Sequence, residues 1–251
     1  MKTEWDYSAL AESYVKRPEY APDALEKIIT TAGLSQESRI CDVGAGVAHL
    51  TIPLAKLGCH IDAVEPNDAM RTLGIERTKQ YPAVSWYEGT GEETGRPYGV
   101  YDFVSFGSSF NACKREKALQ ETYNLLKPGK YFVCLWNHRD LEDPIQKEIE
   151  SIIKKSVSSY GYGTRREDQS EVINKSGLFG PITYIEGKIF WKEKIQDVIE
   201  AWGSHATLQR QSGDSFTTIL KNISDYLLSL NQESITIPYT TRAWMAARLE
   251  K

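Results

Sequence analysis

Two glycines and two acidic residues in the first third of the chain have the spacing of a ligand site. The stretch "RICDVGAGVAHL", residues 39–50, begins as an apolar strand, passes through Gly44 and Gly46, and continues as a helix. Glycines at such a turn let a ligand approach the backbone, because they carry no Cβ. Asp42 ends the strand, and Glu65 ends the next predicted strand 23 positions later. These residues predict a ligand crevice at the end of a sheet.

The residue types around the turn distinguish between two kinds of nucleotide. A dinucleotide site normally has a third small residue where this chain has His49. We expect the Asp42 carboxylate to face the crevice, where it would repel a pyrophosphate and attract a cation. Glu65 can accept hydrogen bonds from both hydroxyls of a ribose. S-adenosylmethionine meets these requirements, since it carries a ribose, an ammonium and a sulfonium but no phosphate. The expected cofactor-binding residues here are Asp42, Gly44, Ala45, Gly46, Glu65, Pro66 and Met70.

Strand and helix patterns alternate around this turn. The apolar periodicity predicts strands at 39–43, 61–64, 84–87, 101–106, 131–136, 182–191 and 240–249. It predicts helices at 23–34, 49–57, 69–79, 114–126 and 143–160, and near 194–203 and 215–230. Strands separated by helices imply right-handed βαβ units. The prediction is an α/β, Rossmann-like fold with a seven-stranded, mostly parallel sheet, an antiparallel last strand, helices on both faces and a helical cap.

Composition excludes several classes of protein. The 251 residues contain 41% hydrophobic residues, which is enough for one large domain, and 30 basic against 34 acidic residues give a net charge of −4. Without a concentrated basic stripe, a nucleic-acid partner is disfavoured. The start lacks the apolar core of a signal peptide, and there is no apolar run of about 18 residues, so we expect a cytoplasmic protein without a membrane partner. The four cysteines have no CxxC spacing and are expected to be buried, with no metal site.

The segment "ICDVGAGVAHLTIPLAKLGCHIDAVEPNDAM" resembles motif I and the acidic motif of class I S-adenosylmethionine-dependent methyltransferases, and the likeness extends over residues 7–136. The resemblance implies that the "GTGEE" loop holds the adenine, with Thr90, Gly91 and Glu92 nearest. "YDFVSFGSSFNACKREKALQETYNLLKPGKYFV" resembles the fourth-strand motif and the helix after it, which implies that the backbone of Phe106 and Gly107 lines the methionine and methyl end.

The leader "LAESYVKRPEY" resembles that of small-molecule methyltransferases of the trans-aconitate type, and the "WDYS" opening has a weaker likeness to methyltransferases that tailor bacterial surface polysaccharides. This resemblance implies a lid in which Tyr14 and Arg17 border the cofactor and the substrate. We therefore expect a single methyltransferase domain over residues 1–251, with a lid at 1–22, a cofactor-binding core at 23–139, and a cap with the last strands at 140–251.

Methyl transfer depends on placing an acceptor lone pair in line with the carbon–sulfur bond, and an alcohol acceptor also needs a general base. His138 follows the fifth strand at its carboxyl end and is the first candidate base. His205 lies between two late helices that can close over the cleft, and Asn111 stands where trans-aconitate-type relatives carry His. These three are the catalytic candidates, whereas His49 and His60 are expected to be structural.

Arginines near the same edge, Arg17, Arg139, Arg165 and Arg166, favour an acidic substrate, because the pair at 165–166 can clamp an anion. The hypothesis is transfer of a methyl group to a small polar or anionic metabolite, at oxygen rather than nitrogen, by a monomer or homodimer. Three alternatives remain open at this stage: an NAD(P)-dependent oxidoreductase, a non-catalytic S-adenosylmethionine-binding module, and an RNA methyltransferase.

Overall fold

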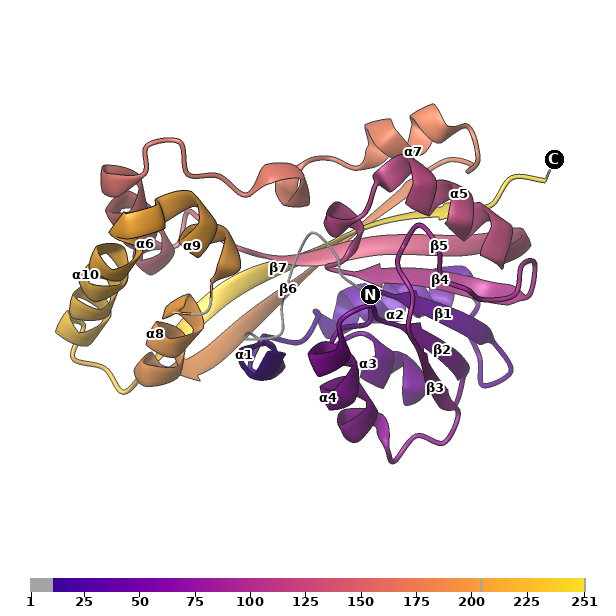
Figure 1. The fold of residues 1–251 in the computed structure, drawn as a ribbon, viewed down its shortest axis with the longest axis horizontal. Coiled ribbons are helices and arrows are strands. Elements are labelled where there is room, and N and C mark those ends of the chain that lie inside the picture. Colours follow the sequence, from indigo (N-terminus) through magenta and orange to yellow (C-terminus); the bar gives the residue numbers. More distant parts are fainter. Residues whose placement is uncertain (1–10, 204, 251) are drawn as a thin grey trace.

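The computed structural model describes residues 11–203 and 205–250, and these residues form one mixed sheet with helices on both faces (Figure 1). The strands of the sheet are β1 (Arg39–Val43), β2 (His60–Val64), β3 (Val84–Tyr87), β4 (Tyr101–Gly107), β5 (Leu126–Arg139), β6 (Thr183–Lys194) and β7 (Ser234–Ala247). Their order is β3-β2-β1-β4-β5-β7-β6, and β7 runs antiparallel to both β5 and β6. The predicted fold class, including the antiparallel last strand, is confirmed.

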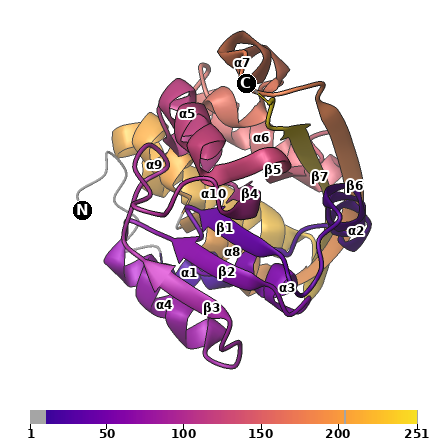
Figure 2. The same cartoon turned by 90° about the vertical axis from the view of Figure 1, so that its right-hand side faces the viewer.

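Two layers of helices bury the faces of the sheet (Figure 2). On one face, α5 (Arg115–Leu125) and α7 (Ser170–Ser176) pack against a core that contains Phe106, Phe132 and Trp244. On the other, α2 (Pro22–Ala32) and α3 (Thr51–Ala55) cover Ile40 and Phe103. Beyond them, α4 (Asp68–Thr78) lies beside β3. The apolar stripes of these helices explain the arrangement, because each stripe is buried against the sheet.

The cap is a separate cluster of helices at one end of the molecule, where β5, β6 and β7 extend beyond the parallel strands (Figure 1). It consists of α6 (Pro144–Ser156), α8 (Ile195–Gly203), α9 (Ala206–Ser212) and α10 (Phe216–Ser229). Their apolar faces share a core with Ile235 and Ile237 of β7. The described residues also contain three short 3₁₀ turns: η2 (Phe110–Ala112), η3 (Gly163–Arg166) and η4 (Gly213–Ser215).

Some element boundaries differ from the sequence expectation. The helix expected at 49–57 is reduced to α3, because Ala48 has a positive φ of 72° and residues 46–50 form a turn. The strands expected at 131–136 and 240–249 are longer, since β5 pairs with β7 as far as Arg139 and β7 pairs with β6 from Ser234 onwards. The helices α7 and α9 were not predicted.

The leader crosses from the cap to the sheet. Its described part contains α1 (Ala11–Val15), which packs against α4, and an extended segment that enters α2. Residues 1–10 of the predicted lid lie outside the described residues, and the division of the chain into lid, core and cap stays a prediction. In the part of the chain that the structure describes, no helix has the length and apolar character needed to cross a bilayer.

Candidate functional site

A cavity of about 740 Å³ opens at the carboxyl ends of the parallel strands, between the sheet, the leader and the cap. This is where open α/β sheets hold their ligands. All the expected cofactor-binding residues except Phe106 line it, as do the three catalytic candidates. The Phe106 side chain is fully buried and packs edge-on against Phe110, with ring centroids 5.3 Å apart. The side chain of Phe106 therefore belongs to the core and not to the cavity wall.

The glycine turn has the backbone geometry that excludes other residues. Gly44 and Gly46 have φ values of 67° and 56°, in the left-handed region. A Cβ added to Gly44 would lie 2.4 Å from the Cβ of Ser109, so the turn passes close to the loop after β4. The amides of Gly44 and Ala45 donate to the carbonyl of Val64 at 2.8 and 3.1 Å. These bonds hold the turn against the end of β2.

Glu65 joins the turn to the next strand. Its Oε2 accepts from the Gly46 amide and its Oε1 from the Asn67 amide, both at 2.9 Å. The side chain is only 7% exposed, and burial raises its pKa. Each carboxylate oxygen has a second lone pair, so both can still accept ribose hydroxyls. Because the Gly46 amide donates to Glu65, it is not directed at a pyrophosphate as in a dinucleotide site.

Asp42 lies beneath the turn and is fully buried, although it belongs to the cavity lining. Its Oδ2 accepts from the Thr51 hydroxyl at 2.6 Å and its Oδ1 from the Ser105 hydroxyl at 2.7 Å. Burial raises its pKa from 3.8 to about 6, against these two hydrogen bonds, which lower it. Asp42 thus lines the cavity as expected, but hydroxyls hold both of its oxygens, so that it would act on a ligand through its charge.

The expected adenine loop follows β3 and is fixed to neighbouring segments. The Thr90 hydroxyl accepts from the Glu93 amide at 3.2 Å, and Glu92 Oε1 accepts from the Lys114 amide at 2.5 Å, at the start of α5. A Cβ added to Gly91 would lie 2.4 Å from Sγ of Cys113. The cavity wall is therefore backbone at this point, which suits the edge of a planar base.

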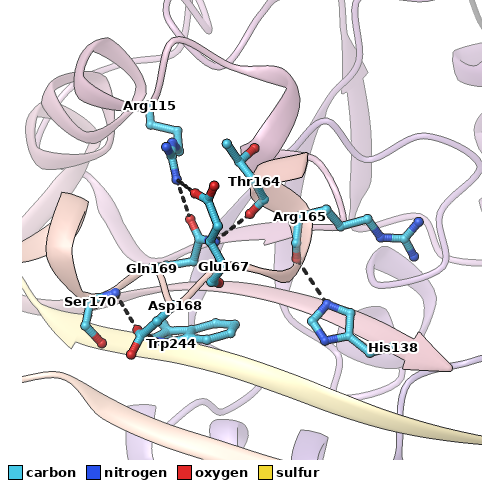
Figure 3. Close-up of polar contacts among 9 residues, drawn as sticks. All are labelled: Arg115, His138, Thr164, Arg165, Glu167, Asp168, Gln169, Ser170 and Trp244. Carbon is cyan, nitrogen blue, oxygen red and sulfur yellow. Dashed lines mark hydrogen bonds and ion pairs between the residues drawn. The ribbon is translucent and has the colours of Figure 1, made fainter. Parts of the chain in front are cut away.

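The structure argues against His138 as a general base. Its Nε2–H donates to the carbonyl of Arg165 at 3.1 Å, and its Nδ1 is buried without a hydrogen-bond partner (Figure 3). Burial, with Arg165 and Arg166 nearby, lowers its pKa to about 3. A ring with one nitrogen committed and the other inaccessible does not receive a proton from a substrate in this arrangement. The expected catalytic role is corrected to a structural one.

His205 is also engaged elsewhere, as the N-cap of α9. Its Nδ1 accepts from the Leu208 amide at 3.2 Å, and its ring stacks on Trp202, with centroids 4.9 Å apart. Burial lowers its pKa well below its usual value. With Nδ1 occupied, His205 can only donate from Nε2 and is not a base. Asn111 lines the cavity and accepts from the Trp136 indole at 2.8 Å through Oδ1, which orients its amide.

Four guanidinium groups line the cap side of the cavity. The carbon Cζ of Arg17 lies 3.4 Å from the centre of the Tyr14 ring. Arg165 donates to the carbonyl of Asn137 at 3.2 Å, and Arg166 to the carbonyl of Arg139 at 2.7 Å. Burial, together with neighbouring arginines, lowers the pKa of Arg165. These groups form a positively charged region in a partly buried cleft, as an anionic ligand requires.

Sequence reasoning missed the residues that attach the leader to the sheet. Asn137 Nδ2 donates to the carbonyls of Pro18 and Glu19 at 3.2 and 2.8 Å, and its Oδ1 accepts from Thr241 at 2.5 Å. The Thr241 hydroxyl in turn accepts from the Ala21 amide at 2.8 Å. These partners are more than 100 positions apart in the sequence, so no local pattern indicates them. This network fixes the end of the leader that carries Tyr14 and Arg17 to the cavity.

The described histidines, cysteines and acidic residues give no indication of a metal site. Among the residues that the structure describes, no three of them are grouped so that they would hold an ion. The four cysteines are free, and three of them are buried.

Part of the chain resembles known methyltransferases. Residues 41–134 match the family model described as "Methyltransferase domain". Over 137 residues the chain is 29% identical to an uncharacterized methyltransferase of Mycobacterium tuberculosis, covering 55% of this chain and 54% of that protein. The chain spans about half the length of the curated relatives it matches first. The matched segment contains the glycine turn, Glu65 and the adenine loop.

Solved structures share the fold across nearly the whole chain. A putative type II methyltransferase from Anaeromyxobacter dehalogenans matches with a TM-score of 0.60 and 14% identity, covering 94% of this chain and 100% of that one. Phosphoethanolamine N-methyltransferase 2 from Haemonchus contortus, in complex with S-adenosyl-L-methionine, matches with a TM-score of 0.56 and 15% identity, covering 97% and 57%. Residues 41–134 thus resemble a methyltransferase domain, and these solved methyltransferases share the fold of the chain. The Haemonchus contortus enzyme was solved with S-adenosyl-L-methionine bound.

Proposed function

We propose that this protein transfers a methyl group from S-adenosylmethionine to an oxygen atom of a small anionic metabolite. One observation supports the proposal most strongly: a single cavity is bordered at one end by Gly44, Gly46 and Glu65 and at the other by Arg139 and Arg165. The first end suits a cationic nucleoside and the second suits an anion. A cofactor and an acceptor of opposite charge would meet between them.

The residues of the turn fit the cofactor. Glu65 would accept the ribose hydroxyls, the Thr90 to Glu92 loop would border the adenine, and the buried charge of Asp42 would favour the cationic methionine end. Gly44 lets the turn pack closely against Ser109 at this end, because a Cβ there would collide with that residue. When bound, S-adenosylmethionine supplies an electrophilic methyl group and is released as S-adenosylhomocysteine.

The chain's own contribution would be orientation and exclusion of water. The arginines would bind the acceptor, and the leader, held by Asn137, would cover the reacting atoms. No general base is required, because an anionic oxygen already presents a lone pair. The engagement of His138 and His205 in other hydrogen bonds supports such an acceptor over a neutral alcohol.

Three other functions are less well supported. For an NAD(P)-dependent oxidoreductase, the Gly46 amide would have to face a pyrophosphate, yet it donates to Glu65. A module that binds S-adenosylmethionine without transfer needs no acceptor site, yet the cavity continues to Arg139 and Arg165. The arginines lie inside this cavity and do not form an exposed stripe, which disfavours an RNA substrate.

Transfer of label tests the proposal. The protein is incubated with methyl-labelled S-adenosylmethionine and fractionated small metabolites, and mass spectrometry identifies the product. We expect label in an acidic fraction, as an ester or ether. Glu65→Ala should weaken S-adenosylhomocysteine binding by about 1–3 kcal/mol through the lost ribose bonds. Glu76→Ala, an exposed glutamate on α4, is the matched control and should bind normally. Cofactor binding without any labelled product would support the non-catalytic module instead.

A further inference from the structure

The cap side of the cavity combines positive charge with an apolar wall. Besides the arginines, its lining includes Val198 and Ala201 of α8 and Ile237 of β7. Val198 and Ile237 also belong to the core of the cap, so the apolar wall continues that core. A ligand in this half of the cavity would therefore contact guanidinium groups and aliphatic side chains at the same time.

The arginines of this half have neutral partners. Arg139 donates through Nε to the Tyr239 hydroxyl at 3.2 Å, and its Cζ lies 4.3 Å from the centre of the Trp202 ring. Arg165 and Arg166 donate to backbone carbonyls. A guanidinium has five N–H donors, and a carboxylate or phosphate is its strongest partner. These interactions leave donors and positive charge for an anionic ligand.

The segment that carries Arg165 is held firmly in place (Figure 3). Gln169 accepts from Arg115 of α5 at 3.1 Å and donates to the carbonyl of Thr164 at 2.9 Å. Asp168 accepts from the Trp244 indole at 2.8 Å. The carbonyl of Arg165 itself accepts from His138. This preorganisation lowers the entropic cost of holding an anion at the Arg165 side chain.

The acidic residues at this end do not neutralise the arginines. Asp197 pairs with Lys16 at 3.3 Å, and Glu193 accepts from the Trp191 indole at 2.8 Å. Both acids therefore interact with other groups at the edge of the cavity. A fully polar anion would satisfy the guanidinium groups but would itself make no favourable apolar contact with the wall of Val198, Ala201 and Ile237.

We infer that the acceptor is an amphipathic anion, whose carboxylate or phosphate group lies against Arg17, Arg139 and Arg165 and whose apolar body lies against Val198, Ala201 and Ile237. This inference rests on the proposed function, since it describes the acceptor half of the same cavity. It separates the acceptor from small polycarboxylates, which have the anionic groups and lack the apolar body.

Four probes of matched size test the inference by calorimetry, with the protein saturated with S-adenosylhomocysteine. 3-Phenylpropionate has both features, tricarballylate has only the anionic groups, 3-phenylpropanol has only the apolar body, and 2-phenylethyl phosphate replaces the carboxylate. 3-Phenylpropionate or 2-phenylethyl phosphate should bind about tenfold or more tightly than the other two, as expected for burial of one aromatic ring or pairing of one anion. The preferred member of this pair identifies the anionic group. Equal or tighter binding of tricarballylate or 3-phenylpropanol would overturn the inference.

Two variants locate the contacts. Arg165→Met should weaken the better probe by about tenfold, whereas Arg210→Met, on the exposed side of α9, should not. Ala201→Phe should fill the apolar half and weaken the same probe, with S-adenosylhomocysteine affinity unchanged. Retained cofactor binding shows in each case that the variant is folded. If S-adenosylhomocysteine fails to bind even the unmodified protein, the proposed function is wrong; if it binds and neither variant weakens the probe, only the inference fails.

Discussion

Replacement of Asp42 by asparagine should stabilise the folded protein at neutral pH while weakening its hold on the cofactor. The carboxyl is fully buried, and its pKa rises from 3.8 to about 6 on folding. The folded protein therefore binds this proton more tightly than the unfolded chain does. Ionisation of Asp42 therefore lowers the free energy of unfolding. The same charge would attract a cationic ligand, which gives the buried carboxylate a function.

The size of this cost follows from the pKa values. The difference is about two pKa units, and each is worth about 1.4 kcal/mol, so ionised Asp42 costs about 3 kcal/mol. The cost is complete above pH 6, decreases as the pH falls through the interval between the two pKa values, and vanishes below 3.8. Asparagine is neutral throughout, and the hydroxyls of Thr51 and Ser105 can rotate to donate or accept. We expect a gain of about 1–3 kcal/mol at pH 7.5.

The assay is urea denaturation at pH 4.5, 6.0 and 7.5, followed by fluorescence of the six tryptophans. The difference between Asp42→Asn and the unmodified protein should increase with pH up to about 6 and then remain constant. Asp214→Asn, at an exposed position in η4, controls for the loss of one negative charge. A variant that is less stable at pH 7.5, or a difference that does not depend on pH, would refute the reasoning.

Cofactor binding supplies the second half of this prediction. A cationic ligand above the Asp42 carboxyl should lower its pKa, so that binding releases a proton near pH 6. The affinity of the unmodified protein for S-adenosylmethionine should therefore fall below pH 6. Asp42→Asn should bind more weakly at pH 7.5 and lose this pH dependence. Titration calorimetry in two buffers of different ionisation enthalpy measures both quantities.

Three further variants test the leader and the adenine loop. Lys16→Glu replaces the ion pairs between the leader and α8 with like charges and should speed S-adenosylhomocysteine dissociation several-fold in stopped flow. High salt should speed dissociation from the unmodified protein in the same way. No change in either experiment would show that these ion pairs do not hold the leader over the cofactor. Asn137→Ala should expose the leader to proteolysis and raise the KM for the acceptor more than it lowers kcat, whereas an unchanged cleavage rate would contradict its anchoring role. Gly91→Ala should weaken S-adenosylhomocysteine binding in calorimetry, and an added Cys113→Ala should restore it, because the clash is with that sulfur.

The order of elements was largely predictable from the sequence because βαβ units bury local apolar patterns. The strand at Val84–Tyr87 was predicted with its observed limits, since it is short and bounded by turns. The extension of β5 and β7 was not predicted, because it depends on the pairing of β5 with β7, on the pairing of β7 with β6 and on the cap. Short helices such as α9 lack the length over which periodicity is detectable.

The cofactor end of the site was also readable, since Gly44, Gly46 and Glu65 lie in one local motif and line the cavity. The roles of His138 and His205 could not be predicted from the sequence. His138 lies at the expected edge of the sheet, but its ring donates to Arg165, 27 positions away, and this contact removes it as a base. His205 caps its own helix, which makes its position between two helices structural. Residue type and position at the sheet edge thus indicate which residues lie near the ligand. Their hydrogen-bond partners decide which of them can act as a base.

Binding of S-adenosylhomocysteine tests most directly whether the cavity is the site of S-adenosylmethionine. Titration calorimetry at pH 7.5 measures the affinities of the unmodified protein and of Glu65→Ala for S-adenosylhomocysteine and for NADH. We expect S-adenosylhomocysteine to bind with a dissociation constant on the order of 1–100 μM, to weaken in Glu65→Ala, and NADH not to bind. Binding of NADH in place of S-adenosylhomocysteine would contradict the assignment of this cavity to a methyl donor.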